Sequence, residues 1–399
     1  MKLFNLPIPK ILLYILLSLP SAAFSQAIIG NNGTTTNTNG TNSSAIPTAV
    51  PFLLISPDSR SGAMGEAGVA ISPDVNANYW NPSKLAFIEG TDDVSASYSP
   101  WLRSLVPDVS LSYLAYAHKL DDRNTIGASI RYFNLGTINL TDNSQNNQGT
   151  YTPNEYSIDG SFARKFGEDF SLGLTLRYIH SNLYTGFASS SSQQTKPGNA
   201  VAADISFYYK TAVQQFGNDG VFSLGTNISN IGSKISYADN GTKYFLPTNW
   251  KLGVADMINL DETNQLTFTL DLNKLLVPTP PIRDLDGNII KGKNDDVSVP
   301  AGIFGSFTDA PGGFSEEMQE INISPGVEYW YNKMFALRAG YYYQNPNKGG
   351  LRYFTLGTGF KYDIFAFDFS YIAASQQSSP LANTLRFTLT ANFGSTNNK

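Results

Sequence analysis

Hydrophobic and polar residues alternate with a period of two along most of the chain from residue 93 onward. The pattern is clearest at the C-terminal end, where one face carries Leu385, Phe387, Leu389, Ala391 and Phe393 and the other carries Thr384, Arg386, Thr388, Thr390 and Asn392. Successive side chains of a β-strand point to opposite sides, so this alternation predicts strands with one apolar and one polar face. We predict fourteen strands, over residues 93–99, 108–118, 124–134, 155–166, 170–181, 199–210, 220–230, 247–257, 264–274, 321–331, 335–344, 352–362, 364–373 and 383–393.

The number and length of these segments are typical of an antiparallel outer-membrane β-barrel. Single-chain bacterial barrels have an even number of strands, and a tilted strand needs about 9–11 residues to cross the bilayer. Short joins, such as residues 167–169 and 332–334, alternate with long ones, of which residues 276–320 are the longest. Outer-membrane barrels have short periplasmic turns and long external loops, so we expect both termini in the periplasm.

Composition supports a barrel whose outer face meets lipid. Charged residues make up 15% of the chain, against roughly 25% in soluble domains, while aromatic residues make up 13%. No apolar run after the first 20 residues approaches the roughly 20 residues of a membrane helix, which excludes a helical membrane protein. We therefore expect an outer-membrane protein in contact with lipid and lipopolysaccharide.

The N-terminus has the features of a secretory signal peptide, residues 1–25. Lys2 and Lys10 flank the start of an apolar stretch at 11–19, and Ala23-Phe24-Ser25 forms a small-residue cleavage site. Cleavage there removes two positive charges and takes the formal net charge from −5 to −7. This negative balance argues against a nucleic-acid partner.

Two further segments precede the barrel, which we expect over residues 91–399. Residues 26–57 include a tract rich in Gly, Asn, Thr and Ser, which predicts a flexible leader. Residues 58–90 contain small and helix-favouring residues interrupted by Ser72-Pro73. We predict two short helices there, over residues 61–70 and 75–85, that form an N-terminal hatch inside the lumen.

The polar strand faces predict the interior of the barrel. They carry charges of both signs, namely Arg131, Lys165, Arg177, Lys251, Arg338, Lys361 and Arg386, and Asp159, Asp204, Asp271, Glu328 and Asp368. Rings of one sign select ions, whereas mixed charges can pair with each other and with a plug, so we expect a closed lumen. The aromatic triplets at 329–331 and 341–343 are expected at the two membrane interfaces.

Candidate catalytic and metal-binding residues are few. His118 and His180 fall near opposite ends of predicted strands and cannot share a site across a membrane core of about 30 Å. The chain has no Cys and no G-x-S-x-G motif, so we expect neither an enzyme nor a bound cofactor or metal. The run from Asp284 to Asn288 is similar to the start of a calcium loop, but Asp295 stands where an EF-hand has Glu, which favours a plain turn.

Two motifs in the predicted hatch resemble a known family. They are RSGAMGEAGVA at residues 60–70, with Met64 and Gly65, and NANYWNPSKLA at residues 76–86, with Trp80, Asn81 and Pro82. Together they resemble the hatch of FadL-like barrels, a fourteen-stranded superfamily. With the polar leader before them, they resemble its PorV branch, the outer-membrane component of the type IX secretion system of Bacteroidetes.

The resemblance implies a non-enzymatic role in protein transport. PorV-like proteins join the outer-membrane translocon barrel, accept secreted cargo through its C-terminal signal domain and deliver it to the surface attachment complex. The alternative is a FadL-like channel for the uptake of hydrophobic small molecules, since a fold alone does not decide function. The polar lumen-facing residues suit an apolar ligand poorly.

The longest loop contains a candidate partner-binding segment. Residues 299–307 carry no charge and are flanked by Asp295, Asp296 and Asp309. Exposed apolar segments rimmed by polar residues mark binding surfaces, so Ile303, Phe304 and Phe307 are candidate contacts with the translocon or cargo. Packing onto the barrel's own rim is the alternative. Residues 316–320 predict a short solvated helix in the same loop.

Overall fold

The computed structural model describes residues 27–29, 35–37, 42–43, 45–101, 108–141, 144, 146–183, 196–239, 241–284, 286–374, 381 and 383–394. The predicted signal peptide lies outside these residues. The chain forms two compact units, Met1–Ser44 and Ala45–Lys399. In the first unit β1 (Ala27–Ile29), β2 (Thr35–Asn37) and β3 (Asn42–Ser43) pair as an antiparallel sheet. Backbone pairing thus gives regular structure to part of the leader that we expected to be flexible.

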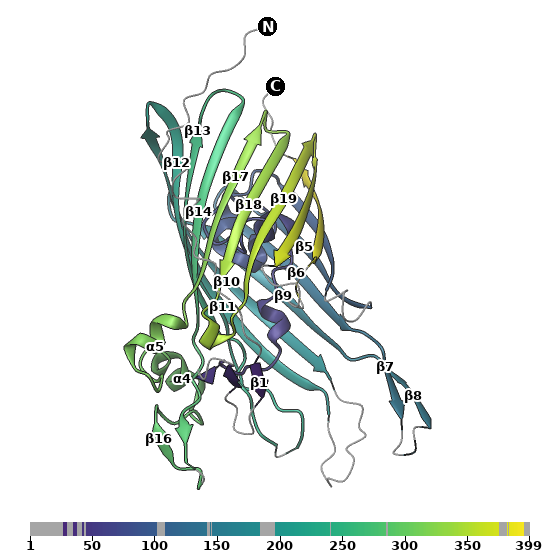
Figure 1. The fold of residues 1–399 in the computed structure, drawn as a ribbon. Helices are drawn as coiled ribbons and strands as arrows, with labels where there is room; N and C mark the ends of the chain where they lie inside the picture. Colours follow the sequence, from purple (N-terminus) through teal and green to yellow (C-terminus); the bar gives the residue numbers. More distant parts are fainter. Residues whose placement is uncertain are drawn as a thin grey trace. The chain divides into compact units, whose positions relative to one another are not determined.

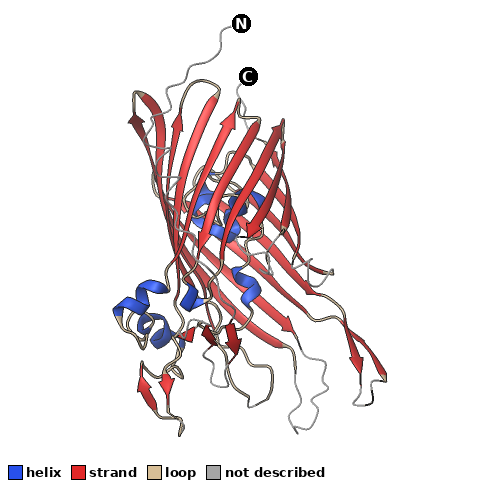
Figure 2. Cartoon of the chain, in the orientation of Figure 1, coloured by secondary structure: helices blue, strands red, loops and turns tan. Residues whose placement is uncertain are grey.

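The second unit is a closed antiparallel barrel of fourteen strands (Figures 1 and 2). Each predicted strand is present, and pairing of the last strand with the first, with Phe393 opposite Asp92, closes the barrel. The strands are β4 (Asp92–Pro100), β5 (Val109–Lys119), β6 (Asn124–Leu135), β9 (Asn154–Lys165), β10 (Phe170–Asn182), β11 (Gly198–Gln215), β12 (Asn218–Gly232), β13 (Asn249–Asn259), β14 (Asn264–Leu275), β17 (Asn322–Tyr331), β18 (Phe335–Tyr343), β19 (Arg352–Tyr362), β20 (Phe365–Ala374) and β21 (Leu385–Phe393).

The pleat of the strands sorts side chains between an inner and an outer face. On β10, Leu172, Leu174 and Leu176 are exposed, whereas Thr175 and Arg177, at the alternate positions, are buried. This distribution is the reverse of a soluble protein and is required of a wall that meets lipid outside and a polar lumen inside. Among the described residues no helix is long and apolar enough to span a bilayer.

The two ends of the barrel differ in their connections (Figure 1). At the short-turn end a few residues join consecutive strands, as at 120–123, 166–169 and 332–334. At the long-loop end the joins carry extra elements: the hairpins β7 (Ile138–Thr141)–β8 (Asn147–Tyr151) and β15 (Ile282–Arg283)–β16 (Ile289–Lys291), helices α4 (Val299–Gly305) and α5 (Phe314–Gln319), and η3 (Pro346–Lys348). The predicted alternation of short and long joins is confirmed.

A segment that we call the plug, residues 49–88, lies inside the barrel (Figure 2). It contains η1 (Pro51–Leu54), α2 (Ser59–Gly62), α3 (Ala77–Trp80) and η2 (Pro82–Phe87). The buried stretch begins before the predicted end of the leader, because Phe52 and Leu53 pack in a hydrophobic cluster with strand residues, and the Phe52 ring stacks 6.3 Å from that of Phe133. The leader is therefore shorter than we expected.

Both helices predicted for the plug are shorter than expected. The first, predicted over 61–70, ends at Gly62, and Gly65 and Glu66 then adopt φ values of 71° and 67° that an α-helix does not allow. The second, predicted over 75–85, is divided at Asn81, whose backbone is extended because Pro82 follows it.

The aromatic triplets do not form simple interfacial rings. Tyr342 packs inside the barrel, where its ring stacks 5.1 Å from that of Tyr353. Trp330 lines the inner cavity and lies 5.3 Å below the guanidinium of Arg338. Consecutive strand residues alternate sides, so the middle residue of each triplet faces the lumen, while Tyr331 is exposed.

Candidate functional site

The plug is held together by the buried carboxylate of Asp58. One carboxylate oxygen accepts the backbone N–H of Ser61 at 2.9 Å, which caps α2. The other accepts the indole N–H of Trp80 at 2.6 Å, which joins α2 to α3. Asp58 is fully buried, so these bonds replace the water that the carboxylate loses.

Ion pairs join one side of the plug to strands β17, β18 and β20. Arg60 forms a bidentate pair with Glu328, at 2.8 and 2.9 Å, and a second pair with Asp74 at 2.9 Å. Glu328 also accepts from Arg338 at 2.7 Å, and Arg338 reaches Asp368 at 2.6 Å. The network alternates positive and negative groups, so no member is left as an isolated charge in the interior.

Close backbone contact fixes the same side of the plug to β18 and β19. Thr355 Oγ1 accepts the N–H of Gly65 and donates to the carbonyl of Ala63, both at 2.8 Å. A Cβ on Gly65 would lie 2.6 Å from the backbone of Tyr341, and one on Gly340 would lie 2.1 Å from the nitrogen of Gly65. Glycine is needed at both positions because the two backbones touch.

A further set of hydrogen bonds joins the plug to β11 and β14. Asp271 Oδ2 accepts the N–H groups of Gly68 and Val69, at 2.7 and 2.9 Å. The amide of Asn81 donates to the carbonyls of Val69 and Phe207, both at 3.0 Å. Lys84, which is 1% exposed, donates to the carbonyl of Gly68 at 2.7 Å. The plug is thus bonded to the wall on several sides.

The residues singled out from the sequence as the hatch, Met64, Gly65, Trp80, Asn81 and Pro82, are all buried in the plug. The expected pairing of lumen charges is also present: Arg177 pairs with Asp159 and Asp204 at 2.7 and 2.9 Å, and Arg386 pairs with Glu66 at 2.9 Å. Sequence reasoning missed the plug's own charged residues, Asp58, Arg60, Glu66 and Lys84. Strand periodicity could not find them because they lie outside the strands.

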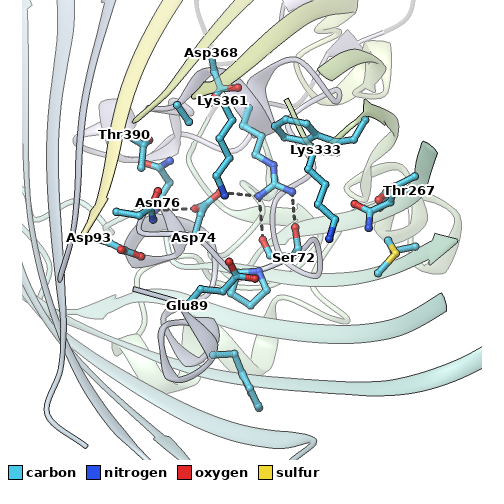
Figure 3. A pocket seen from close by; sticks show the side chains of 18 of the residues that line it. Ser72, Asp74, Asn76, Glu89, Asp93, Thr267, Lys333, Lys361, Asp368 and Thr390 are labelled. Atoms are coloured by element: carbon cyan, nitrogen blue, oxygen red, sulfur yellow. Dashed lines mark hydrogen bonds and ion pairs between the residues drawn. The ribbon is translucent and has the colours of Figure 1, made fainter. Parts of the chain in front are cut away.

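A cavity of about 680 Å³ lies at the short-turn end, and part of its lining is supplied by the plug (Figure 3). Plug residues Ser72 and Asp74 contact Arg60 there, while Lys333 and Lys361 reach in from the strand ends. Acidic and basic groups share the lining, so the cavity has no uniform charge. Apolar residues such as Val221, Ala255 and Met257 also line it, so the cavity is a vestibule of mixed polar and apolar character.

The longest loop, which we call the shelf (residues 276–320), packs against the outside of the wall. Figure 1 shows α4 and α5 beside the barrel at the long-loop end. The ring of Phe307 lies 6.1 Å from that of Trp250 on β13, in an edge-on contact. Lys274 of β14 pairs with Glu317 at 3.0 Å and with Glu320. Lys348 of η3 pairs with Glu320 at 3.0 Å.

The three candidate partner residues of the shelf differ in their exposure. Phe304, on α4, is 78% exposed, whereas Ile303 is half-buried. Phe307 uses part of its surface to pack on the rim, as the alternative interpretation expected. The helix predicted at 316–320 is present as α5, but only one side of it is exposed: Glu317 and Glu320 are buried, where Lys274 and Lys348 pair with them.

Other candidate chemistry in the shelf and strands is structural. Asp284 Oδ1 accepts the backbone N–H of Asn288 at 2.7 Å within the β15–β16 hairpin, as the side chain that opens a turn does. Burial raises the pKa of Asp309 to about 6, and its carboxylate accepts the N–H of Thr279 at 3.2 Å. His118 contacts Asp92 at the short-turn end, and His180 contacts Asn199 at the other end. Within the described ranges no cluster of three metal-ligating side chains occurs.

A closed fourteen-stranded barrel with an exposed apolar outer face and a buried polar inner face is an outer-membrane β-barrel protein. The family model described as type IX secretion system protein PorV matches residues 38–282. The chain belongs to this PorV family.

Solved structures match the chain at low sequence identity. A mutant of the TodX monoaromatic hydrocarbon channel has a TM-score of 0.49 and 12% identity, with 84% of this chain and 98% of that chain covered. The CymD monoaromatic hydrocarbon channel has a TM-score of 0.47 and 13% identity, with 85% of this chain and 98% of that chain covered. A Pseudomonas aeruginosa FadL homologue has a TM-score of 0.39 and 11% identity, with 88% of this chain and 99% of that chain covered. No curated protein matches the chain.

Proposed function

We propose that this PorV-family protein acts without catalysis as a carrier in type IX secretion. In this role it associates with the outer-membrane translocon barrel, binds cargo through the C-terminal signal domain and delivers it to the surface attachment complex. The observation that carries the proposal is a lumen occupied by a bonded plug, combined with a protruding loop that exposes Phe304. A barrel whose lumen is filled and whose loop exposes an aromatic side chain suits protein recognition better than the passage of solutes.

Uptake of hydrophobic small molecules is the alternative function. The cavity at the short-turn end favours it, because a channel needs an internal space. An apolar ligand would, however, have to displace the ion pairs of Arg60 and the bonds of Asp271 to pass the plug. Breaking buried charged contacts is costly unless the ligand replaces them, which a hydrocarbon cannot do.

The proposal also requires that the long-loop end faces the outside of the cell. The chain has no Cys, so single cysteines can be labelled with a membrane-impermeant reagent on whole cells. Lys291→Cys in β16 should react and Glu168→Cys in the β9–β10 turn should not; both positions are exposed in the structure. Labelling of Glu168→Cys alone would show that the short-turn end faces outside, and the shelf could then not reach partners at the cell surface.

Phe304→Asp tests the proposed partner contact. An aromatic anchor of this kind contributes roughly 2 kcal/mol or more when desolvated, so co-purification of the translocon and export of signal-bearing cargo should fall about tenfold or more. The matched control is Phe216→Asp, because Phe216 is 94% exposed in the β11–β12 turn at the opposite end.

The control variant should export cargo normally, and both variants should keep the heat-modifiable mobility of a folded barrel. Normal export by the Phe304→Asp variant would show that the partner binds another surface of the protein. Loss of export by both variants would mean that exposed phenylalanines serve assembly instead of recognition. Uptake of a hydrophobic substrate by the intact protein, with no effect on export when the gene is deleted, would favour the channel.

A further inference from the structure

Helix α5 has its amphipathic character inverted. Phe314 and Met318, four positions apart and therefore on one helix face, are 79% and 51% exposed. The carboxylates of Glu317 and Glu320 are buried instead, at 6% and 5% exposure. A helix of a soluble loop would direct its charges to water and its apolar residues inward, so water is not the expected environment of this exposed face.

The buried carboxylates form ion pairs with a lysine on the outer wall of the barrel, Lys274. Phe268, Leu270, Leu272 and Lys274 follow one another at alternate positions of β14 and therefore share its outer face. Phe268 and Leu270 are 50% and 38% exposed, as lipid-facing residues are, but Lys274 is 6% exposed under the shelf. Pairing with Glu317 and Glu320 neutralises this lysine where the wall approaches the hydrocarbon region.

We propose that α5 lies on the outer membrane as an interfacial helix, with Phe314 and Met318 inserted at the boundary between lipid headgroups and acyl chains. Its exposed face adjoins a surface that lipid already covers, because α5 packs on the outer face of β14 and leads directly into β17. Apolar side chains of such helices insert about 5–10 Å into this boundary. Lipid is therefore the occupant of this face, whatever partner Phe304 contacts.

Site-directed spin labelling of the purified barrel in lipid nanodiscs tests this inference. Single cysteines replace Phe314 and Met318, with Leu176→Cys on the outer face of β10 as a lipid reference and Asn288→Cys in the β15–β16 hairpin as a water reference. Leu176 is 65% exposed, and Asn288 is an exposed loop residue. The ratio of accessibility to oxygen over accessibility to a soluble nickel chelate separates the two environments.

The ratios at positions 314 and 318 should shift from the value at Asn288→Cys toward the value at Leu176→Cys. Ratios equal to the water reference would overturn the inference. Protection that appears only after the translocon barrel is added would also overturn it, and would assign the face to a protein partner. The nanodiscs contain no partner protein in the first measurement, so its result does not depend on whether the protein carries cargo. Heat-modifiable mobility of each variant confirms that the barrel being measured is folded.

Discussion

The plug and the shelf both lie outside the barrel strands and are bound to the barrel wall by buried ion pairs, but they place their apolar side chains differently. In the plug, Met64 and Leu85 are buried together with the charged Arg60–Glu328 pair. In the shelf, the carboxylates of Glu317 and Glu320 are buried while Phe304 and Phe314 protrude. The charged side chains of the plug pair with groups of the wall or of the plug itself, whereas Phe304 and Phe314 of the shelf leave most of their surface uncovered by the residues described.

This difference suggests that the plug closes the lumen, whereas the shelf offers a contact surface. A segment whose polar groups are bonded to the wall on several sides has little to gain by moving, because each lost bond would leave a buried group unsatisfied. A segment that exposes large apolar side chains lowers its free energy when something covers them. The comparison therefore predicts that changes to the plug alter permeability and stability, while changes to the shelf alter contacts with the surroundings.

The largest expected effect comes from removing the plug. Deletion of residues 58–88 should leave the barrel folded, because its strands bond to one another around a closed ring, and should allow water and ions into the polar lumen. Conductance in planar bilayers should rise from near zero in the intact protein to that of an open pore. Equal conductance of both forms would show that the plug does not seal the lumen.

A smaller but still large effect is expected from Glu328→Gln. This change removes the negative charge that Arg60 and Arg338 share and leaves each guanidinium group with a single acidic partner, Asp74 or Asp368. Breaking a buried ion pair costs about 3–5 kcal/mol, measurable as a lower free energy of unfolding in urea. Glu262→Gln, at an exposed position in the β13–β14 turn, is the matched control and should change stability by less than about 0.5 kcal/mol. Equal effects of both variants would argue against the network.

Gly340→Ala should have an intermediate effect through shape alone. Its Cβ would overlap the backbone of Gly65, so the plug must shift, at a cost of about 1–3 kcal/mol. Occasional conducting openings in bilayer recordings should accompany the loss of stability. Gly160→Ala is the control, since a Cβ at that position of β9 meets no atom within 4 Å. Unchanged behaviour of Gly340→Ala would mean that the wall, and not the plug, yields.

The smallest effect is expected from Lys274→Met in the shelf. The variant leaves Glu317 without its ion-pair partner while Lys348 still holds Glu320, so local opening of the shelf should become easier by about 1–2 kcal/mol. Limited proteolysis should cut residues 276–320 faster, with urea stability of the barrel unchanged. A loss of barrel stability comparable to that of Glu328→Gln would remove the distinction between the two segments.

Strand positions, the lumen-facing set and the alternation of short and long joins could be predicted from the sequence because they depend on local periodicity. Leu385 and Arg386 face opposite sides whatever the rest of the chain does, since neighbouring strand residues always do. The same rule would have placed Trp330 and Tyr342 inside the barrel, had it been applied within the aromatic triplets. The hatch residues were found from a motif, and that motif did not reveal what they contact.

Tertiary structure alone decided which charges meet. Arg60 and Glu328 are separated by 268 residues, and Glu66 and Arg386 by 320, so their pairing depends on closure of the barrel around the plug. The inverted burial on α5 is also a long-range effect: Glu317 is buried because Lys274, 43 residues earlier, occupies an outer-face position of β14. Periodicity reports which side of its own element a residue occupies, whereas burial and charge pairing depend on which other element closes over that side.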